Sequence, residues 1–149
     1  MKLRVNHYEA NPAAYEAMMQ LESYIRQSGL DPMLYDLIKL RVSQINGCSF
    51  CIDMHGKHLQ HEGEAFERIL LLTAWREASI YSDKEKAALA LAECLTRLPE
   101  TGVPDDVYER AREHFDEKEY VDLIMAVVTI NGWNRLGVGT GMSPGCLLR

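Results

Sequence analysis

Residues 31–55 read DPMLYDLIKLRVSQINGCSFCIDMH, and this stretch predicts two successive helices. Asp31-Pro32 is typical of a helix start, because Asp caps the first free N–H groups and Pro fits the first helical position. Apolar side chains then recur at the three- and four-residue spacing of one buried helical face: Leu34, Leu37, Ile38, Val42 and Ile45. Asn46-Gly47 is typical of a helix end. The second helix is therefore expected to begin near residue 48 and to reach residues 62–63.

The same start signals and apolar spacings predict helices along the rest of the chain. The expected ranges are 11–29, 65–75, 82–95, 104–114 and 118–136. The last of these is apolar nearly all round over residues 120–130, which is typical of a helix in the core or in a subunit interface. No alternating apolar and polar run predicts a strand. The sequence therefore predicts a single all-α domain over residues 1–149 with about six to seven helices.

The composition is that of a globular protein, with 47% hydrophobic and 26% charged residues. A net charge of −6 argues against nucleic acid as a partner, because phosphate contacts need clustered Lys and Arg. Residues 1–7 do not lead into the apolar stretch of a signal peptide, and residues 121–130 are too short to span a membrane. The cytoplasm is the expected location. The tail, residues 142–149, lacks periodicity and is expected to be loosely ordered or docked on a neighbouring subunit.

The placement of two cysteines and a histidine is the main functional signal. Four cysteines in a cytoplasmic chain are expected to be reduced at rest, and a close pair is then catalytic or metal-binding rather than a structural bridge. Cys48, Cys51 and His55 fall on one face of the helix that begins near residue 48. The thiols are expected in its first turn, where free N–H groups and the helix dipole stabilise a thiolate. His55 can accept the thiol proton or, as imidazolium, stabilise the thiolate.

Two thiols three residues apart can cycle between dithiol and disulfide. One attacks a peroxide, and the other resolves the resulting sulfenic acid. The residues therefore predict a two-cysteine peroxidase or a disulfide reductase. No organic cofactor is implied, because no glycine-rich phosphate loop follows a strand.

Residues 39–55, KLRVSQINGCSFCIDMH, closely resemble the core motif of the AhpD-like alkylhydroperoxidases, within the carboxymuconolactone decarboxylase superfamily. The likeness continues in AWRE at residues 74–77 and INGWNR at residues 130–135. It implies an all-α subunit that assembles into homotrimers or homohexamers. It also implies reduction of an alkyl hydroperoxide by the cysteine pair, with electrons from a protein dithiol such as a lipoylated or thioredoxin-like partner.

The resemblance also implies roles for single residues. In that family a Glu twelve residues before the first Cys joins the His in a proton relay, and this chain has Asp36 there. This acid is one methylene shorter, so a direct contact with His55 can become water-mediated. Members with an extra His between the two cysteines have it where this chain has Phe50. We assign Cys51, nearer the His, as attacking thiolate and Cys48 as resolving thiol; the reverse order stays open because Cys48 is nearer the helix dipole.

Other interpretations compete with the peroxidase. Cys48, Cys51 and His55 resemble three zinc ligands, with His58 as a fourth on the same face, although structural zinc sites usually join pairs from separate segments. Some superfamily members decarboxylate a small lactone acid, but they act without a redox pair. A third possibility is a non-catalytic binding or redox-sensing oligomer whose disulfide alters assembly.

The acid and the histidines also have interpretations that involve no catalytic role. Asp36 can form a surface ion pair with Lys39, three residues later, which would contribute little stability. His58 and His61 are expected to be solvated at the end of their helix, and His7 carries no functional signal.

Overall fold

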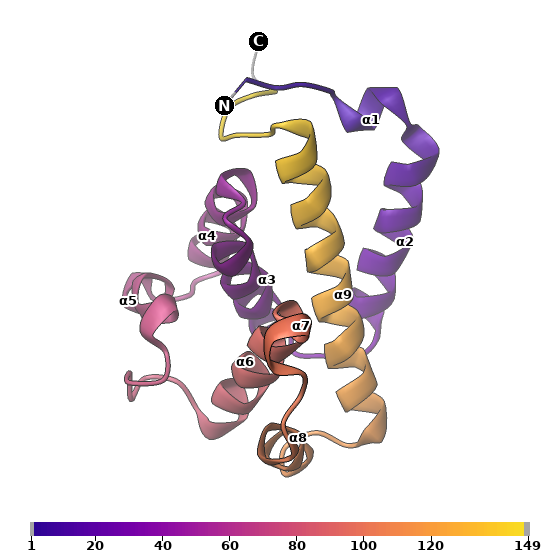
Figure 1. Cartoon of the computed structure of the whole chain (residues 1–149). Coiled ribbons are helices and arrows are strands. Elements are labelled where there is room, and N and C mark those ends of the chain that lie inside the picture. The colour runs from indigo at the N-terminus through magenta and orange to yellow at the C-terminus, as the bar shows by residue number, and fades with distance from the viewer. Residues whose placement is uncertain (1, 148–149) are drawn as a thin grey trace.

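Helices account for all regular structure in residues 2–147, the part of the chain that the computed structural model describes (Figure 1). In chain order they are α1 (His7–Ala10), α2 (Pro12–Gln27), α3 (Pro32–Asn46), α4 (Ser49–His61), α5 (Phe66–Leu70), the 3-10 helix η1 (Leu71–Ala74), α6 (Asp83–Thr96), α7 (Leu98–Thr101), α8 (Asp105–Arg112) and α9 (Glu117–Thr140). The predicted all-α class is confirmed. None of these described helices combines the length and apolar character needed to cross a lipid bilayer.

The number of helices differs from the prediction. Within residues 2–147 there are nine α-helices, so the expected six to seven is too low. α1 and α7 are single turns of four residues, which are too short to show an apolar period. The segment expected as one helix over residues 65–75 divides into α5 and η1. The last helix is longer than expected and ends at Thr140.

Gly47 sets the junction between α3 and α4. Its φ of 66° is the left-handed conformation that Gly adopts without steric cost, and it ends α3. The N–H groups of Gly47 and Cys48 donate to the carbonyls of Gln44 and Ser43, which satisfies the last carbonyls of that helix. The chain leaves this turn in an extended conformation at Cys48, the N-cap of α4. The turn therefore decides where the first cysteine lies.

α9 runs through the middle of the molecule, between α2 on one side and the pair α3 and α4 on the other (Figure 1). It begins with a capping box, in which the side chains of Asp116 and Glu119 each accept the other's backbone N–H. Its apolar side chains join α3 and α6 in one buried cluster, whose fully buried members include Ile38, Val42, Leu91, Leu123 and Ile130. Most of residues 120–130 thus lie in or against the core, whereas Val121 and Val128 are about half exposed, at 52% and 49%.

A second buried cluster joins α3 to α4, η1 and α6. Within it, Trp75 is 4% exposed and donates its ring N–H to Glu93 at 2.9 Å. Glu93 also pairs with Arg41 at 2.7 Å and Arg76 at 2.5 Å, so this buried carboxylate is well compensated. The AWRE motif at residues 74–77 therefore holds α6 against α3.

The two ends of the chain meet at the C-terminal end of α9 (Figure 1). The Arg4 N–H donates to the Thr140 carbonyl at 2.8 Å, and the Met142 N–H donates to the Gly137 carbonyl at 2.9 Å. Met142 is buried, at 6% exposure. The described part of the tail therefore docks beside the N-terminal segment of its own chain, whereas residues 148–149 lie outside the described residues.

Candidate active site

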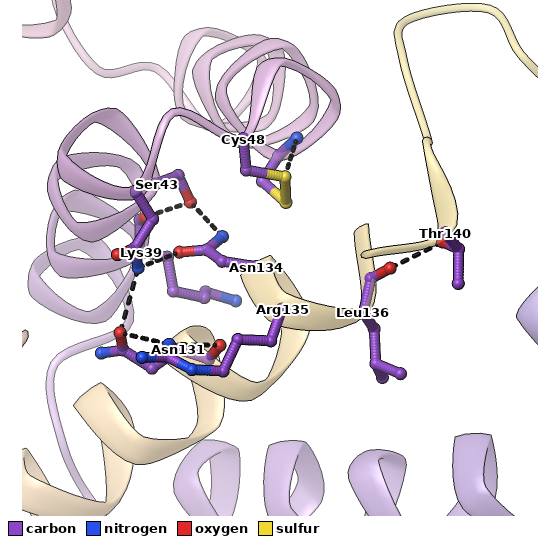
Figure 2. Close-up of a disulfide and its surroundings, with 10 residues drawn as sticks. Lys39, Ser43, Cys48, Asn131, Asn134, Arg135, Leu136 and Thr140 are labelled. Atoms are coloured by element: carbon purple, nitrogen blue, oxygen red, sulfur yellow. Dashed lines mark hydrogen bonds between the residues drawn. A yellow bond between two sulfur atoms is a disulfide. The ribbon is translucent and has the colours of Figure 1, made fainter. Parts of the chain in front are cut away.

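Cys48 and Cys51 are joined by a disulfide at the start of α4 (Figure 2). Their Cα atoms lie 5.3 Å apart, within the usual range for a disulfide. The sulfur of Cys48, the N-cap residue, also accepts the Cys51 backbone N–H at 3.3 Å. The expectation that all four cysteines are reduced is not met for this pair, while Cys94 and Cys146 are free. The structure holds the oxidised state of the predicted thiol pair.

A cavity of about 320 Å³ lies beside the disulfide. Cys51 lines this cavity and Cys48 does not, although both are buried, at 3% and 1% exposure. The apolar and aromatic part of its wall consists of Tyr8, Tyr15, Met19, Phe50, Met54, Trp133 and Met142. A molecule in the cavity would therefore meet the sulfur of Cys51 before that of Cys48.

Gly137 of α9 makes room for the disulfide. A Cβ at this position would lie 3.0 Å from the Cys48 sulfur and 3.5 Å from the Cys51 sulfur. The shorter distance is well inside the optimal separation of two heavy atoms. Cys48 has little freedom to move away, because it is both the N-cap of α4 and half of the disulfide. Gly137 thus allows α9 to approach the start of α4 closely.

Polar side chains tie the end of α3 to α9 beside the disulfide (Figure 2). The Ser43 hydroxyl donates to the Lys39 carbonyl at 2.7 Å and accepts from the Asn134 amide at 3.0 Å. The Asn46 amide donates to the side-chain oxygens of Asn131 and Asn134 at 3.0 and 2.9 Å. The INGWNR motif at residues 130–135 thus fixes the segment that leads into the disulfide.

His55 lies one helical turn after Cys51 and lines the cavity. It is 5% exposed, and its Nε2 atom has no hydrogen-bond partner among the described residues. Burial, helped by the positive charge of Lys39, lowers the pKa of His55 to about 4. The imidazole is therefore neutral at pH 7 in the oxidised protein, and its free nitrogen can accept or donate a hydrogen bond.

Asp36 is buried, at 1% exposure, but its partners differ from both interpretations of the sequence. Its carboxylate lies 2.8 Å from Arg26, 3.2 Å from Lys39 and 3.3 Å from His58. The pair with Lys39 therefore forms, but in the interior rather than at the surface. Burial raises the pKa of Asp36, but the hydrogen bond from Arg26 and the charge of Lys39 outweigh it, so the pKa lies below its ordinary value.

Asp36 contacts His58 directly, whereas the link from Asp36 to His55 that the resemblance implies, through water, stays a prediction. The reason for the contact with His58 is the register of α3 and α4, which pack against each other across the turn at Gly47. Asp36 lies eleven residues before that turn and His58 eleven residues after it, so the two are level. His55 is closer to the turn and is level with a later part of α3.

Glu22 of α2 is an acid of the site that sequence reasoning missed. Its carboxylate accepts from Lys39 at 2.7 Å, from the Tyr35 hydroxyl at 3.0 Å and from the Trp133 ring at 3.3 Å. Burial raises the pKa of Glu22, but the charge of Lys39 and these hydrogen bonds outweigh it and lower the pKa overall. Its spacing was the available signal, because Glu22 lies four residues after Met18 on the apolar face of α2.

Two histidines outside the predicted site also line the cavity. His58 is exposed as expected, with 42% of its side chain accessible, yet it contributes to the cavity wall. His7 of α1, which carried no functional signal in the sequence, is 9% exposed, and neither ring nitrogen has a hydrogen-bond partner in the described part of the chain. His7 and His55 are 48 residues apart, so only the fold brings them to one cavity.

The zinc interpretation would need the cysteine pair and its neighbouring histidines to converge on one point. Across residues 2–147, no group of three or more His, Cys, Asp or Glu side chains is arranged to hold a metal ion. In this state the sulfurs of Cys48 and Cys51 are bonded to each other, and His58 contacts Asp36.

Comparison with known proteins finds a family profile that matches over half of the chain and two relatives that match nearly all of it. The sequence profile of the carboxymuconolactone decarboxylase family matches residues 12–93. The uncharacterised protein YdfG of Bacillus subtilis is 48% identical over 141 residues, which are 95% of this chain and 96% of that protein. A solved structure from Agrobacterium tumefaciens, the protein of unknown function ATU0492, has a TM-score of 0.93 at 44% identity over 96% of this chain and 99% of that one. That protein has been suggested to be an antioxidant defence protein of the AhpD type.

A more distant relative carries a named activity. The alkyl hydroperoxide reductase AhpD of Acidobacterium capsulatum is 35% identical over 79 residues. The match covers 52% of this chain and 42% of that protein, so this chain corresponds to less than half of the reductase.

We expect Gly137→Ala to destabilise the oxidised protein by about 1–2 kcal/mol relative to Gly139→Ala, because the new methyl group overpacks the disulfide. Gly139 is the matched control on the same helix, since a Cβ there meets nothing within 4 Å. Alanine is the better helix former, so the control should be unchanged or more stable by up to about 1 kcal/mol. Urea unfolding of both variants measures this. Equal stability of the two would contradict the packing argument.

The buried neutral His55 should make the oxidised protein less stable in acid. The pKa of His55 is about 4 when folded and 6.5 when unfolded, so between these values the unfolded chain binds more protons. Stability from this residue is therefore complete above about pH 6.5 and is lost as the pH falls toward 4. Integration gives a loss of about 2 kcal/mol in the free energy of unfolding between pH 7.5 and 5.

Urea unfolding of His55→Gln and His61→Gln at these two pH values measures how much of the pH dependence of stability comes from His55. The first variant should lose most of the pH dependence. A smaller part should remain because of His7, whose pKa is also lowered by burial. The second alters an exposed histidine of the same helix and should behave like the wild type. An unchanged pH dependence in His55→Gln would refute the assignment.

Proposed function

Because the chain belongs to the carboxymuconolactone decarboxylase family, as one of its AhpD-like members, we propose that it is a peroxidase that reduces organic hydroperoxides with Cys51 and Cys48. The observation that carries the proposal is the position of Cys51, which lines the cavity one helical turn before His55, whose imidazole is neutral and whose Nε2 atom has no partner among the described residues. A cysteine nucleophile needs a nearby base to become a thiolate. A hydroperoxide needs an open space beside that thiolate.

The proposed cycle begins from the dithiol. His55 takes the proton of the Cys51 thiol, and the thiolate attacks the terminal oxygen of the hydroperoxide. The O–O bond breaks, Cys51 becomes a sulfenic acid, and the departing alkoxide takes the proton from His55 and leaves as an alcohol. The Cys48 thiol then attacks the Cys51 sulfur, water leaves, and the disulfide seen in the structure forms.

The charges around His55 favour this proton transfer. In the oxidised state, burial and Lys39 lower the pKa of His55, while the charges of Asp36 and Glu22 raise it. A thiolate at Cys51 would add a nearby negative charge, which would raise the pKa of His55 as the two acids do. Ionisation of the thiol and protonation of His55 therefore support each other. Asp36 acts as a positioning residue in this scheme, since it touches neither Cys51 nor the substrate.

The reductant must reach a disulfide whose cysteines are 1% and 3% exposed. We propose a protein dithiol on a long, thin arm, as in a lipoylated protein, because such an arm can enter the cavity that leads to Cys51. A thioredoxin-like partner, the other donor expected from the sequence, would have to present its thiol on a nearly rigid surface. Attack on Cys51 would release Cys48, and a second attack within the donor would restore the dithiol.

Assembly and location remain part of the proposal. A homotrimer or homohexamer would cover apolar side chains that a single chain leaves exposed, including Tyr24, Phe66, Leu70, Val121 and Val128. A cytoplasmic location would supply the reduced dithiols that the cycle needs.

The cavity is less suited to binding a lactone acid, the substrate of a decarboxylase, than to binding a hydroperoxide. Lys39 is the one Lys or Arg among the residues that line it within the described chain. It is already paired with Glu22 at 2.7 Å and Asp36 at 3.2 Å. A carboxylate substrate would therefore find no unpaired cation there, and binding it would bring a third acid into the site.

Single serine variants should separate the two sulfurs. With one equivalent of cumene hydroperoxide, reduced Cys48→Ser should form a sulfenic acid at Cys51 that dimedone traps, because the resolving thiol is missing. Cys51→Ser should leave Cys48 reduced over the same time, since a serine hydroxyl is a poor nucleophile and Cys48 lies outside the cavity. Mass spectrometry with peptide mapping measures both.

The reverse pattern, with trapping at Cys48, would reverse the assigned order. If neither thiol reacts with the hydroperoxide but the wild-type disulfide is reduced and re-formed by small disulfides, the protein is a disulfide reductase and the peroxidase proposal fails.

A further inference from the structure

His7 is a buried polar side chain that the proposed cycle does not use. It is 9% exposed and lines the same cavity as Cys51 and His55. Neither of its ring nitrogens has a hydrogen-bond partner in the described part of the chain. Burying an unpaired polar group is unfavourable, and such groups in native proteins call for an explanation, such as a catalytic role. The segment that leads into His7 is tied to the end of α9, because the Arg4 N–H donates to the Thr140 carbonyl.

Three other polar side chains of the cavity wall already have partners. Glu22 and Lys39 bind each other at 2.7 Å, and His58 contacts Asp36 at 3.3 Å. Among the buried side-chain nitrogen and oxygen atoms of the described residues, those without a partner are both ring nitrogens of His7 and the Nε2 atom of His55. Burial lowers the pKa of both imidazoles, so both are neutral at pH 7. A polar group that binds between them gains most if it is uncharged and can both donate and accept hydrogen bonds.

The rest of the cavity wall suits a ligand with an aromatic ring. Tyr8 stacks on His7 with ring centroids 4.2 Å apart, Tyr15 follows at 4.6 Å, and Trp133 follows Tyr15 at 5.7 Å. Thioethers of Met19, Met54 and Met142 complete the apolar surface. Aromatic rings and methionine sulfur both make favourable contacts with an aromatic ligand. The volume of about 320 Å³ lies at the low end for ligand pockets, which fits a molecule of roughly ten to fifteen non-hydrogen atoms.

We infer that the substrate is a compact, uncharged aromatic hydroperoxide and that His7 binds its peroxide group, an inference that rests on the proposed function. The ring of the substrate packs on the aromatic wall. The N–H of His7 donates to the oxygen next to carbon, which carries the developing negative charge when the O–O bond breaks. The terminal oxygen goes to Cys51, and the proton that His55 took from the thiol goes to the alkoxide. The site would thus prefer such a substrate to hydrogen peroxide, which cannot contact the aromatic wall.

Binding of the unreactive product alcohol tests this without any thiol chemistry. Calorimetric titration of the oxidised protein with 2-phenyl-2-propanol should give a measurable dissociation constant. His7→Phe should weaken binding about tenfold, the effect of one lost hydrogen bond. His7→Gln, whose amide can still donate, should bind within about threefold of the wild type, and His61→Gln, which alters an exposed histidine, should bind equally well. The ¹⁵N shifts of His7, identified by their absence in His7→Phe, should move on binding.

Three results would overturn the inference: no binding of the alcohol, equal binding by His7→Phe, or equally tight binding of benzoate, which is aromatic but charged. The rate of Cys51 oxidation then separates the inference from the proposed function. Alcohol binding that depends on His7, with thiols inert to cumene hydroperoxide, would keep the binding site and refute the peroxidase. Oxidation of Cys51 at equal rates by cumene hydroperoxide and hydrogen peroxide, unaffected by His7→Phe, would keep the peroxidase and refute the substrate class.

Discussion

The buried ammonium group of Lys39 is the charge around which the site is built. Its side chain is 4% exposed, and an ammonium ion removed from water costs several kcal/mol unless it is paired. Glu22 at 2.7 Å and Asp36 at 3.2 Å provide that pairing, and the ring of Tyr35 lies 4.2 Å from the nitrogen. This arrangement explains why two acids are buried here, and its ion pairs link the side chains of α2, which carries Glu22, to those of α3. Removal of either acid would leave a buried charge partly unpaired, so the three charged side chains act as a unit.

The disulfide depends on a second constraint, which is geometric. The left-handed turn at Gly47 makes Cys48 the N-cap of α4, and the missing side chain of Gly137 lets α9 pass directly behind the sulfurs. Hydrogen bonds among Ser43, Asn46 and Asn134 hold these two segments together. We expect a frame fixed in this way to keep the two sulfurs close after reduction as well. Closure of the disulfide then needs little reorganisation, which is how oriented groups gain effective concentration.

The sequence predicted those features of the fold and site whose determinants are local. It did not predict features that depend on contacts between distant segments. Caps and apolar spacing predicted the long helices, and a helical turn was enough to place Cys51 and His55 on one face. The contact of Asp36 with His58 was not predicted, because it depends on how α3 and α4 align across their turn. The contact of Glu22 with Lys39 joins two helices, and nothing in either helix alone specifies it. The same holds for His7, which reaches the cavity only because the N-terminal segment pairs with the end of α9.

Charge balance connects the two halves of the site. In the oxidised state the acids Glu22 and Asp36 are matched by Lys39 and Arg26, so the cluster is close to neutral and His55 can stay uncharged. A thiolate formed alone beside this cluster would be an uncompensated charge in a region shielded from water, which is unfavourable. In the proposed cycle the cluster stays neutral only if the imidazolium of His55 forms together with the thiolate. When the disulfide is reduced, His55 would then take up the proton that the leaving alkoxide later requires. A charged substrate would disturb this balance, whereas an uncharged hydroperoxide enters and leaves as an alcohol without changing it.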